Sequence, residues 1–176
     1  MPYIVEYLET ELPVKEYMER CVDVERFLEF CKECRNYNTR WSCPPFPFQP
    51  LQLWSQFERL HLSARVLHPS QDETLPALLE RMWAEKAKMM AELLDREKKL
   101  PHALVLSAGG CSLCGDECTR PCGSPCRKPG EMRYSIDALG GDIGKTMELY
   151  FHRPIVWSHR GEVPAYLTLM GGLLVK

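Results

Sequence analysis

Eight of the nine cysteines of this chain lie in two short segments, and such a density of thiols is typical of metal binding. The longer segment contains Cys111, Cys114, Cys118, Cys122 and Cys126, and the shorter one contains Cys31, Cys34 and Cys43. Glycine, proline and polar residues separate these cysteines, as in loops that wrap around an ion or a cluster. We therefore expect all eight thiols to be metal ligands.

Two kinds of metal centre suit these thiols. Cys31-x2-Cys34 and Cys111-x2-Cys114 both have the Cys-x2-Cys spacing of four-thiolate zinc sites. The two pairs are far apart in the sequence, however, and a zinc site made from them would leave four cysteines unused. Two 4Fe-4S clusters need eight thiolates, the number that the two segments contain. We expect one or two 4Fe-4S clusters, with zinc as the alternative.

The division of the thiols into three and five leaves the ligand sets open. In bacterial two-cluster ferredoxins the last cysteine of a run binds the other cluster, and Cys118 or Cys126 would complete the shorter set in that way. Alternatively, one cluster has only three protein thiolates and an open iron. The first arrangement indicates electron transfer, with a redox partner protein. The second indicates an enzyme that acts on a small sulfur or oxygen ligand.

Three residues near the cysteines are candidates for contact with the cluster itself. Arg127 and Arg133 follow the longer segment, where their positive charge would stabilise a thiolate-bound cluster. Trp41, in the shorter segment, would shield the cluster from water. No residue pattern indicates a particular catalytic group.

The residues around the cysteines resemble a family of predicted metal-binding proteins, domain of unknown function 2284. The matching positions are Cys31, Cys34, Tyr37, Trp41, Cys43, Pro44, Pro45 and Phe46, followed by Cys111, Leu113, Cys114, Cys118, Cys126, Arg127, Pro129, Ser135, Ala138, Gly140 and Asp142. The resemblance spans nearly the whole chain and implies a cytoplasmic protein that binds an iron-sulfur cluster, without implying a reaction. This chain departs from the pattern in the Cys114-x3-Cys118 gap and in having Cys122. If Cys122 is not a ligand, seven thiolates remain and an open iron is favoured.

Composition restricts the class of protein. The chain has 176 residues, of which 45% are hydrophobic and 26% are charged, so we expect one domain, residues 1–176, with its own core. A net charge of -2 offers no positive field for nucleic acid. Residues 1–8 do not resemble a signal peptide, and no apolar segment is long enough to cross a membrane. We expect a cytoplasmic protein, with neither nucleic acid nor membrane as a partner.

The elements that must position the cysteines follow from hydrophobic periodicity. Residues 3–8, 62–67, 103–106, 155–157 and 165–175 are predicted strands, and residues 13–34, 72–100 and 135–150 are predicted to be helical. Asp23 should interrupt the first helix as an N-cap, and Cys21 should lie in its buried face. The prolines after Cys43 should prevent regular structure. We predict a mixed α+β (α/β) fold, in which helices pack on a mixed sheet and the two cysteine loops meet at one end.

Overall fold

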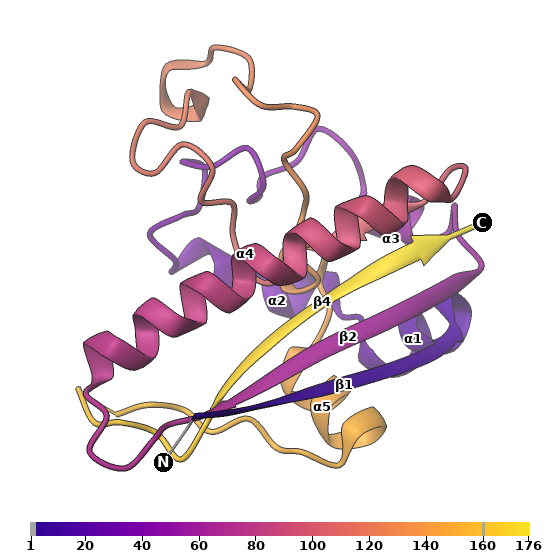
Figure 1. Cartoon of the computed structure of the whole chain (residues 1–176). Helices are drawn as coiled ribbons and strands as arrows, with labels where there is room; N and C mark the ends of the chain where they lie inside the picture. Colours follow the sequence, from indigo (N-terminus) through magenta and orange to yellow (C-terminus); the bar gives the residue numbers. More distant parts are fainter. Residues whose placement is uncertain (1–2, 160) are drawn as a thin grey trace.

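A four-stranded sheet forms the centre of the computed structural model, which describes residues 3–159 and 161–176 (Figure 1). Its strands lie in the order β1 (Ile4–Pro13), β2 (Arg59–His68), β4 (Leu167–Val175) and β3 (Leu104–Leu106). All three pairings are antiparallel. The predicted α+β class is therefore confirmed, while the sheet that we expected to be mixed in direction is antiparallel throughout.

Alternation of side chains explains how the sheet holds a core on one face. In β2, Leu60, Leu62, Ala64 and Val66 are all buried and point to the same face. Helices α1 (Val14–Cys21) and α5 (Ile143–Phe151) lie on this side of the sheet. The core here includes Tyr17, Trp54, Leu139, Met147 and, as predicted, Cys21.

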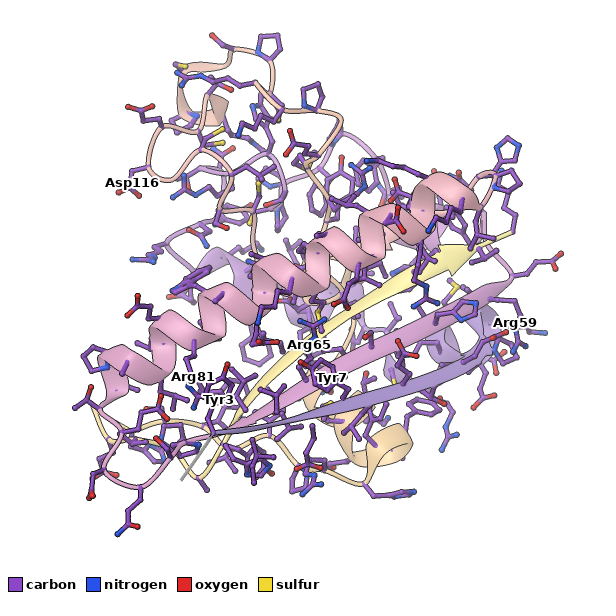
Figure 2. The ribbon with its side chains drawn as sticks, in the orientation of Figure 1. Tyr3, Tyr7, Arg59, Arg65, Arg81 and Asp116 are labelled. Carbon is purple, nitrogen blue, oxygen red and sulfur yellow. The ribbon has the colours of Figure 1, made fainter. Side chains whose placement is uncertain are left out.

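The long helix α4 (Leu75–Lys99) covers the opposite face of the sheet (Figure 1). Its apolar residues Met89 and Leu93 pack on Leu169 and Leu173 of β4. Its middle turns instead bury Glu85 and Lys86. Arg65 of β2, which is only 2% exposed, donates hydrogen bonds to the backbone oxygen and the carboxylate of Glu85 at 2.8 and 3.1 Å. Figure 2 shows Arg65 beside Tyr7 of the neighbouring strand, with the guanidinium 5.0 Å from the ring.

Local capping explains most of the helix boundaries. Asp23 accepts a hydrogen bond from the N–H of Arg26 and begins α2 (Val24–Lys32), so the predicted interruption is confirmed. The predicted helix over residues 135–150 is divided into the short helix η2 (Asp137–Leu139) and α5. Gly140 separates them at a φ of +90°, and a Cβ there would lie 2.7 Å from Val24 Cα. Only glycine fits this joint.

Two local predictions were wrong. Residues 155–157 form no strand, although they are apolar, because no sheet edge pairs with them. The prolines after Cys43 do not exclude regular structure, since Pro50 begins the short helix α3 (Pro50–Trp54). Proline is well tolerated in the first turn of a helix, where its missing N–H would have no partner.

The fold brings the two cysteine segments together. One segment begins in the last turn of α2. The other leaves the sheet after β3 and returns where the N–H of Ser107 donates to the carbonyl oxygen of Tyr134, 2.8 Å away. In Figure 1 both loops lie at one side of α4, away from β1. Within the described residues, no helix is long and apolar enough to cross a membrane.

Candidate metal centres

Hydrogen bonds fasten the two cysteine loops to each other. The Arg120 guanidinium donates to the backbone oxygens of Arg40, Cys43 and Pro45 at 3.2, 2.8 and 2.5 Å. Trp41 Nε1 donates to Thr119 Oγ1 at 3.1 Å. The sequence did not predict the role of Arg120, because its partners are backbone carbonyl oxygens, which every residue has.

Arg40 makes a further connection at the outer edge of this region. Its guanidinium donates to the backbone oxygen of Gly115 and to the carboxylate of Asp116. Figure 2 shows Asp116 at the outer edge of the cysteine region. These hydrogen bonds between the two loops fix the position of one set of thiols relative to the other.

Four thiols line one small cavity in the longer segment. They belong to Cys111, Cys114, Cys118 and Cys126, and all four residues are partly buried. The cavity has a volume of about 20 Å³, and Trp41 and Arg127 also line it. Burial raises the pKa of Cys111, and the neighbouring thiols Cys126, Cys114 and Cys118 raise it further. Two of the three predicted cluster contacts, Trp41 and Arg127, therefore lie beside this four-thiol set.

Three thiols line a second cavity, of about 70 Å³, in the shorter segment. Cys31, Cys34 and Cys43 share this cavity with Asp137, the first residue of η2. Burial, the Asp137 carboxylate and the neighbouring thiols raise the pKa of Cys31 to about 11. Burial likewise raises the pKa of Cys43, against a hydrogen bond from Ser42. The three-thiol set therefore faces a carboxylate that sequence reasoning did not select, since a single aspartate far from the cysteines carries no spacing signal.

The thiols of each set lie around the wall of a cavity. Among residues 3–159 and 161–176, no three His, Cys, Asp or Glu side chains converge closely enough to hold a single ion. The raised pKa values of Cys31, Cys43 and Cys111 favour their protonated forms, so a metal that binds these three thiols must displace their protons.

The linings of the two cavities include two consecutive residues, Gly110 and Cys111. Gly110 lines the three-thiol cavity, and Cys111 lines the four-thiol cavity. Between them, Ser42 Oγ accepts from the N–H of Cys111 at 3.0 Å and lies 3.7 Å from Cys43 Sγ. Lys86 Nζ donates to the backbone oxygen of Gly110 at 2.7 Å. Desolvation lowers the pKa of Lys86, against the opposing effects of Cys111, Asp137 and Cys43.

The remaining candidate residues lie away from the thiol cavities. Cys122 lines neither of them; its exposed thiol donates to the backbone oxygen of Thr119 at 3.1 Å. Hydrogen bonds from Ser124 lower the pKa of Cys122. Arg133 forms an ion pair with Glu97 at 2.5 Å. The structure therefore brings together seven of the eight candidate thiols, in sets of four and three, and places Cys118 and Cys126 in the set of four.

The comparisons with known proteins concern the whole of this region. A family described as predicted metal-binding protein (DUF2284) matches residues 18–175, which include both cysteine segments. No curated protein and no solved structure matches the chain.

Proposed function

Because the chain belongs to the DUF2284 family of predicted metal-binding proteins, we propose that it holds two iron-sulfur clusters and uses them for electron transfer. The observation that carries this proposal is the cavity lined by Cys111, Cys114, Cys118 and Cys126. Four thiols are a complete protein ligand set for a 4Fe-4S cluster. The three-thiol set would hold the second cluster.

The donor chemistry of both cavities suits this assignment. Thiolates are soft ligands that favour zinc or iron-sulfur clusters over magnesium or calcium. A tetrahedral zinc ion requires all four sulfurs at about 2.3 Å from one point, whereas in a cluster each thiolate binds its own iron. Thiols spread around a cavity wall support the second arrangement. The four-thiol cavity has the space of about one water molecule, so these thiols would have to move apart to hold a cluster.

Protein groups around the sulfurs are placed to adjust the properties of such centres. An iron-sulfur cluster supplies one-electron chemistry, at a potential set by nearby charge and by hydrogen bonds to sulfur. The N–H of Asn36 donates to Cys34 Sγ at 3.5 Å, and the hydroxyl of Ser42 faces Cys43 Sγ. Arg127 brings a positive charge to the four-thiol cavity.

The proximity of the two cavities supports electron transfer between them. Their linings include consecutive residues, Gly110 and Cys111, and Ser42 touches both segments. We assign one centre to exchange electrons with a redox partner protein, in the cytoplasm, where reducing conditions keep thiols free.

A second candidate function follows from the three-thiol set. With only Cys31, Cys34 and Cys43 in the cavity, one iron would lack a thiolate ligand. Such an iron would supply Lewis-acid chemistry toward a sulfur or oxygen ligand, and the protein would then be an enzyme. Asp137 is the group that decides between the two functions, because its carboxylate faces the same cavity.

The composition of the protein purified without air tests the proposal directly. We expect about eight irons and eight acid-labile sulfides per chain, with visible absorption. About four of each would leave one of the two sets empty. Zinc without sulfide would contradict both functions and would indicate a zinc-stabilised interaction module.

A further inference from the structure

A third and larger cavity opens beside both sets of thiols. Its volume is about 500 Å³, within the range of sites for small organic molecules. Cys111 and Asp137 line it, and each of them also lines one of the two thiol cavities. A molecule in this space would therefore lie next to both candidate metal centres.

Much of the wall of this cavity is apolar. Met82 of α4 and Leu169 and Met170 of β4 line it. Trp83 and Trp157 also line it and are 51% and 73% exposed. Exposed tryptophans beside a cavity are available to cover an aromatic or aliphatic ligand body.

The polar part of the cavity is mainly cationic. Lys86 is 9% exposed, and its ammonium group donates to the backbone oxygen of Gly110. An ammonium group has three N–H donors, and no second hydrogen-bond partner of Lys86 is found within the described residues. Arg35 adds a second positive charge.

The other charged groups that line the cavity leave an excess of one positive charge. Arg40 and Asp116 bind each other, and the Asp137 carboxylate, which also lines this cavity, offsets one of the two remaining cations. A buried ammonium group with unused donors, next to an apolar wall, favours a ligand that has both an anionic group and an apolar body.

We propose that this cavity binds a small organic anion with an apolar body. Lys86 binds the anionic group, and Trp83, Trp157 and the wall formed by Met82 and β4 enclose the body. This site goes beyond electron transfer, because a small molecule bound in it would lie next to the candidate metal centres. Binding itself requires only side chains of the chain and no metal.

The experiment titrates the anaerobically purified protein with 1-anilinonaphthalene-8-sulfonate, an aromatic sulfonate that fluoresces when bound in apolar surroundings. Lys86→Met removes the ammonium group and keeps most of the side-chain volume. We expect this variant to bind the probe at least about tenfold more weakly. Lys98→Met is the matched control, because Lys98 is an exposed residue of the same helix, and it should bind like the wild type. Benzoate should displace the probe from the wild type more effectively than benzyl alcohol, its neutral analogue.

Iron and sulfide are measured on the same samples, so the two proposals fail separately. Unchanged probe affinity in a Lys86→Met protein that keeps its metal would overturn the anion site. If the wild type contains no iron and still binds the probe at least about tenfold more tightly than Lys86→Met, the cluster proposal is overturned and the anion site stands. If Lys86→Met loses its metal, Trp157→Ala decides, because this exposed side chain can be removed without disturbing the core. We expect several-fold weaker probe binding in that variant, and unchanged binding would contradict the proposal.

Discussion

The hydroxyl of Ser42 accepts a hydrogen bond from the backbone N–H of Cys111 at 3.0 Å, and this contact joins two segments that are far apart in the sequence. Ser42 is completely buried, so water cannot replace it. Because its oxygen accepts from Cys111, its own proton is free to point at Cys43 Sγ, 3.7 Å away. One side chain thus contacts a member of each set of thiols.

Ser42→Ala should therefore destabilise the protein. The variant leaves the Cys111 N–H without a partner in a partly buried position, which costs about 1–3 kcal/mol of unfolding free energy. Urea unfolding of the metal-free, reduced protein measures this loss. Ser55→Ala removes an exposed hydroxyl that donates to Leu51 within one helical turn, so it should change stability by less than about 0.5 kcal/mol. Equal stability of the two variants would show that Ser42 does not hold the segments together.

Cys114 and Cys122 should differ sharply when each is replaced by serine. Cys114 lines the four-thiol cavity, whereas Cys122 is exposed and lines neither thiol cavity. We expect Cys114→Ser to bleach much of the visible absorption and to reduce iron from about eight to about four per chain. Cys122→Ser should retain both. Iron analysis of the two variants checks this, and loss of iron in Cys122→Ser would mean that the longer loop rearranges when metal binds.

The metal-free protein should lose stability as the pH rises above the ordinary pKa of a thiol. The folded state raises the pKa of Cys31 to about 11, whereas an unfolded thiol titrates near about 8.5. Between these values the unfolded chain binds fewer protons, so the free energy of unfolding falls with increasing pH. Below about 8.5 both states carry the proton, and this contribution is constant. Urea unfolding at several pH values measures the slope.

Replacement of single cysteines identifies the source of this slope. Cys31→Ser should make the decline less steep, because the perturbed thiol is gone. Cys122→Ser should not, since the pKa of Cys122 is lowered in the folded protein. Identical slopes in the wild type and Cys31→Ser would contradict the assignment of the raised pKa to that thiol.

The fold could be predicted where local signals agree with burial, and less well where distant partners decide. Asp23 stops one helix and begins the next through its own hydrogen bond to Arg26, so the interruption is readable from the sequence. Residues 155–157 look like a strand because they are apolar, yet a strand exists only if another strand pairs with it. The buried Glu85 and Lys86 were equally unpredictable, since their partners, Arg65 and Gly110, come from other elements.

The same distinction applies to the site. Cysteine spacing selected the candidate thiols, but it could not assign them to the set of four or the set of three. That assignment depends on how the two loops pack against each other. Cys118 and Cys126 were candidates to complete the shorter set by crossover, and the structure places them with Cys111 and Cys114 instead. Cys122, with the same residue type and similar spacing, points elsewhere. Asp137 belongs to no sequence motif, and it lies in the site only because η2 packs on α2.

Asp137 should determine whether the three-thiol centre is closed or open. If its carboxylate completes the ligand set, addition of imidazole to the wild type should leave the electron paramagnetic resonance spectrum of the reduced protein unchanged. Asp137→Ala would then expose an iron, and imidazole should alter the spectrum of that variant. Asp137→Cys supplies a fourth thiolate and should again make the spectrum insensitive. Iron and sulfide must be the same in all three proteins for the comparison to hold. A wild type that already responds to imidazole would show that Asp137 is not a ligand, and it would favour the enzyme with an open iron over simple electron transfer.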